Sequence, residues 1–186
     1  MNPSTEDILK AVNQTPSSVV YVFPNNKNII MAAEQCQSLT SKTVVVVPTT
    51  TIPQGVSCLL CLDPEGEEDD NLASMQEIIP TVHTAQVTYA ARDSDFDGHE
   101  IKAGEYLALL DGALVGSFTD TDTMIGAVIE RIQALDPALI TVYYGSDVSE
   151  DQGVSVAARF EEALPDAETS LVSGGQPVYY FLISAE

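Results

Sequence analysis

The chain has 186 residues, of which 28 are acidic and 7 basic, so its formal net charge is −21. A protein this acidic lacks the lysine and arginine residues that replace counterions on nucleic acid, which excludes a nucleic-acid-binding role. The hydrophobic fraction of 45% is enough for a folded core. Every hydrophobic run falls short of the roughly 18 to 20 residues that span a bilayer, and no secretory signal opens the sequence. We therefore expect a cytoplasmic globular protein without membrane insertion.

The first 80 residues alternate between helix and strand patterns. Ser4 and Asp7 have the spacing of a helix N-cap and its acidic partner, so a short helix should open the chain. Residues 18–23 and 43–47 are β-branched and apolar, as in strands that are buried on both faces. A helix should follow each strand, the second of them beginning near Pro53. One face of the first of these helices is expected to carry Ile29, Ile30, Ala33 and Leu39. This alternation predicts a parallel sheet.

The segment of residues 63–71 is charged and rich in turn formers, which predicts an exposed loop. A helix over residues 72–79 should follow and end before Pro80. From residue 81 onward, short apolar runs separated by turn signals are typical of antiparallel strands. We therefore place a boundary between two lobes near Pro80. The predicted fold class is α/β with two lobes: residues 1–80 with a parallel sheet and helices, and residues 81–186 with a mixed sheet and helices.

The second lobe is predicted from alternating apolar patterns and turn signals. Its helices are expected at residues 120–135 and 152–164. Its strands are expected at residues 86–92, 106–110, 113–118, 139–144, 168–172 and 178–183. Asp111 and Gly112 should form a hairpin turn between the second and third strands. The last two strands should form a closing hairpin around the Ser-Gly-Gly-Gln turn at residues 173–176, whose glycine spacing fits neither a dinucleotide site nor a P-loop.

The loop after the first strand is the first candidate site. It contains Asn25, Asn26, Lys27 and Asn28, between a strand end and a helix start, where α/β proteins place ligands. The amides, the lysine charge and the unpaired N–H groups of the helix could hold a phosphate, a carboxylate or an acidic side chain of a partner. The alternative is purely structural, because asparagines also cap helices and tolerate tight turns.

The loop after the second strand should emerge at the same edge of the sheet. Its polar side chains include Thr49, Thr51 and Gln54, so the two loops could share one crevice. Hydroxyl and amide groups can form hydrogen bonds with a ligand, but no general base or activated nucleophile accompanies them. The pattern therefore favours binding over catalysis.

The cysteines and histidines give weak signals. Cys58 and Cys61 have the spacing of a metal knuckle or redox pair, but no second pair follows, and both lie in an apolar helical run. We interpret them mainly as reduced core residues. His83 and His99 lie in no hydrolase motif, so hydrolase chemistry has no support.

Alternating aspartates at residues 93–98 resemble the start of a calcium loop. The register then fails, because Gly104 occupies the position of the bidentate glutamate and Glu105 follows one residue late. No helical pattern flanks the segment. We interpret it as a polar turn between strands, with a divalent-cation site as the less favoured alternative.

Several motifs along the chain resemble those of one bacterial protein family, the catalytic subunit of fatty acid kinase. This family is also described as DAK phosphatase or dihydroxyacetone-kinase-like protein. The motifs extend over almost the whole sequence and include Arg92 within Val-Thr-Tyr-Ala-Ala-Arg-Asp. They lie at residues 1–8, 24–29, 48–55, 87–93, 97–102 and 174–180.

This resemblance implies a DegV-like fold and a role in phospholipid synthesis. In the family an N-terminal kinase domain binds ATP and magnesium, and this chain is similar only to the last part. No position here matches the kinase residues, so the resemblance implies no catalytic residue, metal or cofactor in this chain. Met1 is then expected to mark a fragment of a longer polypeptide. The name phosphatase finds no support in these residues.

The leading hypothesis is a non-catalytic docking domain. Its implied partners are a DegV-like fatty-acid-binding carrier protein and the kinase domain of the same polypeptide, which phosphorylates the acyl carboxylate. The alternative is a domain that binds a fatty acid or a small anion directly. The predicted contact residues are Asn25, Asn26, Lys27, Asn28, Thr49, Thr51, Gln54 and Arg92.

Overall fold

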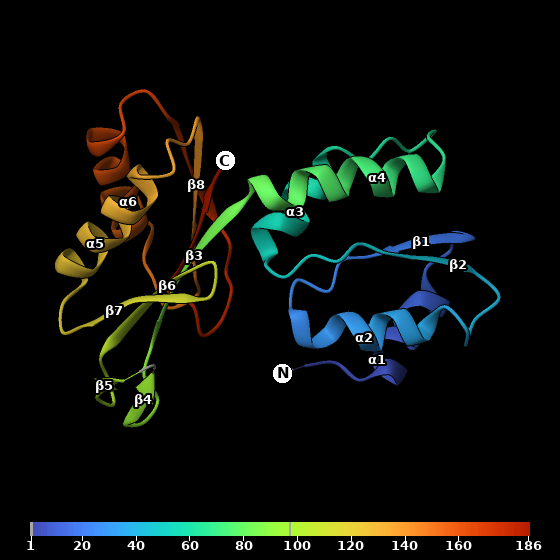
Figure 1. The fold of residues 1–186 in the computed structure, drawn as a ribbon, viewed down its shortest axis with the longest axis horizontal. Coiled ribbons are helices and arrows are strands. Elements are labelled where there is room, and N and C mark those ends of the chain that lie inside the picture. Colours follow the sequence, from blue (N-terminus) through green and yellow to red (C-terminus); the bar gives the residue numbers. More distant parts are fainter. Residues whose placement is uncertain (1, 97) are drawn as a thin grey trace. The chain divides into compact units, whose positions relative to one another are not determined.

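A computed structural model describes residues 2–96 and 98–186. The chain forms two compact units, Met1–Val82 and His83–Glu186 (Figure 1). The sequence-based boundary near Pro80 falls within the short 3₁₀ helix η1, Ile79–Thr81, which ends the first unit. Within the described ranges, no helix is both long and apolar enough to cross a membrane.

The first unit places a small parallel sheet between two pairs of helices. Its elements are α1 (Thr5–Gln14), β1 (Val19–Val22), α2 (Lys27–Cys36), β2 (Thr43–Val46), α3 (Ile52–Leu60), α4 (Glu68–Ile78) and η1. β1 and β2 pair in parallel, with Val19 opposite Thr43. This confirms the predicted parallel sheet. Figure 1 shows the two strands between α1 and α2 on one side and α3 and α4 on the other.

Each face of this sheet has its own apolar cluster. Val20 and Val44 pack with α1 and α2, whereas Val47 packs with Cys58 and Met75 of α3 and α4. Successive residues of a strand point to opposite faces, which explains why one β-branched run serves both clusters. The expected burial on both faces is incomplete in β1, because only Val20 among its residues is buried.

The capping signals in the sequence predict the helix starts well. The Ser4 hydroxyl accepts a hydrogen bond from the Asp7 N–H at 3.2 Å, and the Asp7 carboxylate accepts one from the Ser4 N–H at 2.9 Å. This capping box satisfies two N–H groups at the start of α1. The hydrogen bonds from Ser4 lower the pKa of Asp7, because they favour the charged form of its carboxylate. The predicted opening helix is confirmed.

Two predictions for the first unit are wrong. Leu39 was expected on the buried face of α2, but α2 ends at Cys36 and Leu39 is 57% exposed. Residues 68–71, expected in an exposed loop, form the first turn of α4. Acidic residues stabilise a helix N-terminus, so the charge run starts a helix. Asn71 is buried there and forms hydrogen bonds with the backbone of Asp63 at 2.8 and 2.9 Å.

The second unit is a mixed sheet with two helices. Its strands are β3 (His83–Tyr89), β4 (Ser94–Phe96), β5 (His99–Ile101), β6 (Tyr106–Leu110), β7 (Ala113–Phe118), β8 (Leu139–Tyr144), β9 (Glu168–Ser173) and β10 (Phe181–Ala185). The helices are α5 (Thr121–Gln133) and α6 (Glu150–Ala163). The main sheet has the order β7-β6-β3-β10-β8-β9, and β4 and β5 form a separate short hairpin. In the main sheet β8 and β9 pair in parallel and the other neighbours are antiparallel, which confirms the predicted mixed sheet.

The core of this unit lies between the main sheet and its helices. Both helices contribute to it, with Val128 and Ile132 from α5 and Phe160 from α6. The sheet contributes residues such as Ile140 and Ile183, which are fully buried. Figure 1 shows α5 and α6 together beside the sheet. This arrangement follows from the helical spacing of the apolar residues.

The predicted closing hairpin is wrong. β9 and β10 do not pair with each other, because β8 lies between them. β10 begins at Phe181, three residues later than expected, and joins β8 to β3 in the centre of the sheet. The Ser-Gly-Gly-Gln segment is therefore part of a crossing connection, in which the Gly174 N–H donates to the Tyr144 carbonyl at 3.0 Å. The fully buried pattern of β10 fits this central position.

Candidate functional site

The two polar loops of the first unit meet, as the sequence predicted. The Asn25 N–H donates to the Thr49 hydroxyl at 3.1 Å, and this hydroxyl donates to the Asn25 side-chain oxygen at 2.8 Å. Thr49 is fully buried, and Asn25 has a positive φ of 54°. The loops are thus locked to each other through inward-facing groups. The Asn25 N–H, the Asn25 side-chain oxygen and the Thr49 hydroxyl therefore hold the two loops together at this edge of the sheet.

Gly55 makes this close approach possible. A Cβ atom at this position would lie 2.3 Å from the Asn25 side-chain oxygen. The first turn of α3 therefore packs directly on the Asn25 amide. A larger residue fits here only if the Asn25 side chain moves.

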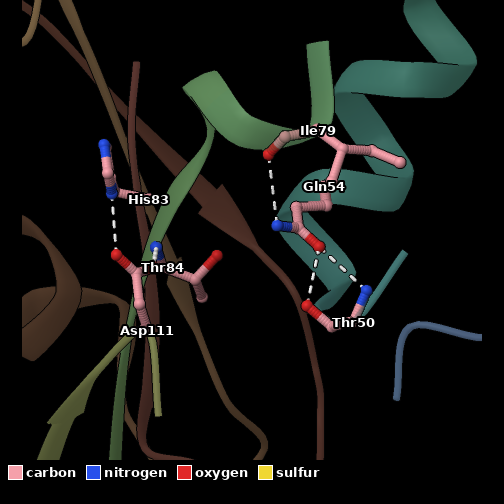
Figure 2. Close-up of polar contacts among 6 residues, drawn as sticks. All are labelled: Thr50, Gln54, Ile79, His83, Thr84 and Asp111. Carbon is pink, nitrogen blue, oxygen red and sulfur yellow. Dashed lines mark hydrogen bonds and ion pairs between the residues drawn. The ribbon is translucent and has the colours of Figure 1, made fainter. Parts of the chain in front are cut away.

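Gln54 also has a structural task. Its Oε1 accepts hydrogen bonds from the Thr50 N–H at 2.8 Å and from the Thr50 hydroxyl at 2.9 Å. Its Nε2 donates to the Ile79 carbonyl at 3.2 Å, so Gln54 ties α3 to η1 (Figure 2). The Gln54 amide therefore forms hydrogen bonds within its own unit, and its role in ligand binding stays a prediction.

Two of the predicted residues are helix caps. The Asn26 side-chain oxygen accepts from the Asn28 N–H at 2.9 Å at the start of α2. The Thr51 hydroxyl accepts from the Gln54 N–H at 3.4 Å at the start of α3. Lys27, in contrast, is exposed in the first turn of α2, as is Asn28. These two side chains are the exposed members of the predicted site in the first unit. Arg92 is exposed too, but it belongs to the second unit.

The hydrogen bonds between Asn25 and Thr49, which lock the two loops together, lead to a prediction about stability. Thr49→Val leaves the Asn25 N–H and side-chain oxygen without this partner, so we expect a loss of about 1–3 kcal/mol in unfolding free energy. Urea denaturation followed by circular dichroism measures it. Thr43→Val is the matched control, because Thr43 is exposed at the start of β2, has no side-chain hydrogen bond among the described residues, and its change should stay within about 0.5 kcal/mol. Equal effects of the two substitutions would contradict the assigned lock.

A contact that the sequence did not predict joins His83 to Asp111. The His83 Nδ1 and an Asp111 carboxylate oxygen lie 2.7 Å apart, and the other oxygen accepts from the Thr84 N–H at 2.8 Å (Figure 2). Asp111 and Gly112 both have positive φ, as in the predicted hairpin turn. The carboxylate therefore fastens this turn to the start of β3. Both side chains are more than a third exposed, so the ion pair adds little stability.

The aspartates of the calcium-like segment bind backbone groups. The Asp93 carboxylate accepts from the Ala103 N–H at 2.7 Å, and the Asp95 carboxylate accepts from the Gly98 N–H at 2.9 Å. Asp97, the third aspartate of the pattern, lies outside the described residues. In the described ranges, no group of three histidine, cysteine, aspartate or glutamate side chains could hold a metal ion.

The thiols of the first unit are free. Cys58 is buried, and its Sγ lies 3.6 Å from the Met75 carbonyl. Cys61 is only partly buried, with its Sγ 3.1 Å from the Cys58 carbonyl. Burial raises the pKa of the Cys58 thiol to about 11, so it is protonated at neutral pH. A protonated core thiol is a poor nucleophile and metal ligand.

The second unit contains a cavity of about 230 Å³ above its sheet. Met124, Val156 and Phe181 form apolar walls, and Tyr106 and Arg159 add polar groups. Arg159 donates to the Asp122 carbonyl at 3.0 Å and lies 3.5 Å from its carboxylate. The Tyr106 and Tyr180 rings lie edge to face, with centroids 5.6 Å apart. This amphipathic cavity was not predicted, because its residues come from five separate segments.

Comparison with known proteins identifies a single family over the entire chain. The model of the FakA-like family, which describes the C-terminal region of a fatty acid kinase component, matches residues 1–186. The protein YloV of Bacillus subtilis is 37% identical over 186 residues, which is all of this chain and 34% of that protein. An uncharacterized protein of Staphylococcus aureus strain USA300 has the same identity and coverage. The chain thus spans about a third of the length of these relatives.

Solved structures with the same fold include fatty-acid-binding proteins. The fatty acid kinase B3 protein of Streptococcus pneumoniae, loaded with linoleic acid, has a TM-score of 0.70 at 12% identity, over 99% of this chain and 76% of that one. A DegV family protein of Corynebacterium glutamicum has a TM-score of 0.71 at 11% identity, over 99% and 82%. A Thermotoga maritima protein, described as revealing fatty acid binding, has a TM-score of 0.68 at 15% identity, over 100% and 76%. These likenesses establish the DegV-like fold.

Proposed function

Because the chain belongs to the FakA-like C-terminal family of fatty acid kinases, we propose that it is a non-catalytic docking domain of a bacterial fatty acid kinase. It binds a DegV-like carrier protein loaded with fatty acid, in the cytoplasm. A kinase domain elsewhere in the longer polypeptide, with ATP and magnesium, then phosphorylates the acyl carboxylate for phospholipid synthesis.

One observation supports docking over catalysis most directly. The inward-facing polar groups of the candidate site are used in holding the two loops and the helices together. The exposed remainder, Lys27 and Asn28, offers a cation and an amide at a helix start, without a base or nucleophile beside them in the described part of this site. Such groups can position a partner surface, whereas a lysine that acts as a base or nucleophile is normally desolvated or paired with an activating group, and Lys27 is exposed.

Lys27 supplies a test of where the carrier docks. Lys27→Ala should weaken binding of the loaded carrier about two- to fivefold, the range expected for one exposed ion pair. Isothermal titration calorimetry against the cognate carrier measures the change. Lys10→Ala, on the exposed face of α1, removes the same charge and should leave the affinity unaltered. Equal affinities of the two variants would move the contact away from this loop, whereas no binding by the unmodified chain would contradict docking itself.

A second candidate function, direct fatty-acid binding, is favoured by the cavity of the second unit. Its apolar walls and arginine suit an acyl chain and a carboxylate. Its volume of about 230 Å³ is, however, below the roughly 300–1,000 Å³ of ordinary ligand pockets. Direct binding of a small anion, rather than a fatty acid, would instead involve Lys27.

Native mass spectrometry of the purified chain separates the two functions. We expect the mass of the bare polypeptide, since the cavity is small for a long acyl chain. A co-purified acyl chain that is lost in Phe181→Asp, but kept in the exposed control Val154→Asp, would establish lipid binding instead.

A further inference from the structure

β2 is an edge strand, and its outer side is open to a partner. Among the described strands, it pairs only with β1. The Thr43 N–H donates to the Ser18 carbonyl at 2.9 Å and the Val47 N–H to the Val22 carbonyl at 3.0 Å, so these odd-numbered residues face β1. In a parallel pair, the alternate residues direct their backbone groups to the opposite side. Val44 and Val46 therefore present theirs to the outer edge.

A groove runs along this edge. Its volume is about 320 Å³, and it is lined by residues 43–46 of β2 on one side. On the other side lie Glu67, Glu68 and Asp69 at the start of α4, together with Leu72. No lysine or arginine is among its described lining residues. The groove thus combines main-chain hydrogen-bonding groups with a wall of carboxylates.

The Gln37 side chain lines the groove and forms a hydrogen bond with the outer edge of β2. Its side-chain Nε2 donates to the outward carbonyl of Val44 at 3.0 Å. This is the hydrogen bond that the backbone N–H of an added strand would form. Natural sheets often cover their edges in such ways, because an open edge pairs readily with another chain. A bound strand must displace this side chain.

We propose that this groove binds an extended segment of a partner protein by β-strand addition to β2. The segment pairs its backbone with Val44 and Val46 and places lysine or arginine side chains against the carboxylates of the α4 start. The backbone groups supply affinity, and the carboxylates select a basic sequence. This interaction goes beyond carrier docking, because it requires neither a fatty acid nor the loop around Lys27.

A labelled peptide tests the proposal. The probe is a nine-residue fluorescein peptide that alternates valine and lysine, and fluorescence anisotropy measures its binding at low salt. A peptide that alternates valine and glutamate is the control and should not bind. Salt should weaken the binding of the lysine peptide. Equal binding of both peptides would overturn the charge selection.

Substitutions in the chain separate strand addition from general attraction to its negative charge. Val46→Pro removes an outward N–H but no charge, and proline is tolerated on an edge strand where the N–H faces outward. It should weaken binding at least about fivefold, whereas Gln37→Ala should strengthen it by freeing the Val44 carbonyl. Glu68→Gln should weaken binding about two- to fivefold, but Glu77→Gln, at the other end of α4, should not.

The result that would overturn the proposal is a folded Val46→Pro chain that binds the lysine peptide as tightly as the unmodified one. If that variant does not fold, a peptide with N-methyl groups on its pairing edge replaces it, and undiminished binding of this peptide is the contrary outcome. Sedimentation of the unmodified chain completes the test. A dimer that dissociates in Val46→Pro would assign the groove to a second copy and overturn the partner segment. Because no carrier protein is used, failure here leaves carrier docking untouched.

Discussion

Replacing Phe160 by alanine is expected to lower the free energy of unfolding by about 3–5 kcal/mol. Phe160 is fully buried in α6, within the apolar cluster that joins both helices to the main sheet. Its removal forfeits the burial of a large side chain and leaves a cavity that close-packed neighbours cannot fill. Urea denaturation measures this change. Tyrosine fluorescence is the suitable signal, because every tyrosine except Tyr21 lies in the second unit.

The matched control is Val154→Ala on the same helix. Val154 is 52% exposed, so its truncation should change the free energy of unfolding by no more than about 0.5 kcal/mol. The comparison holds helix propensity nearly constant and varies burial. If both substitutions destabilised the second unit to the same extent, α6 would not pack on the sheet as described.

Alkylation of Cys58 is expected to be slower than that of an ordinary thiol by at least about a hundredfold. The thiolate is the reacting form, and burial raises the Cys58 pKa from 9.0 to about 11, which reduces the thiolate about a hundredfold at pH 8. Burial also restricts access of the reagent. Iodoacetamide labelling at pH 8, resolved by residue with mass spectrometry, measures the rate. Cys61, which is partly buried, should be labelled before Cys58 and Cys36.

Two controls accompany the labelling. Cys61→Ser should remove the fastest phase, and urea should bring the remaining thiols to a common rate. Labelling of Cys58 as fast as Cys61 in the folded chain would contradict core packing. It would instead favour the redox or metal interpretation of the Cys58–Cys61 spacing.

Local signals determined much of the fold. The strands at Tyr106–Leu110, Ala113–Phe118 and Leu139–Tyr144 have the predicted bounds, because turns or a proline flank their apolar runs. The predicted hairpin turn at Asp111 is present as well. In these segments, residues that are adjacent in the sequence determine the local structure.

Non-local pairing accounts for the errors. The last two strands are close in sequence and apolar, but β8 separates them, and only the completed sheet shows this. The acidic run at residues 68–71 suits both a loop and a helix start. The hydrogen bonds between the Asn71 side chain and the Asp63 backbone favour the helix over the loop.

The proximity of the two polar loops was predictable from the sequence, but the hydrogen bonds between them were not. The two strand ends correctly placed Asn25 near Thr49. The sequence did not indicate that these groups would bond to each other, or that Gln54 would bond to Ile79. The β2 groove was missed for a related reason, because strand order is needed to recognise an edge.

Calorimetric titration of this chain with its cognate fatty-acid-loaded carrier tests the docking function most directly. Docking predicts saturable binding at micromolar or lower concentration, with one carrier per chain. The longer polypeptide that contains the family's kinase domain is the positive control. Binding by that polypeptide and none by this chain would contradict the proposed role of the domain.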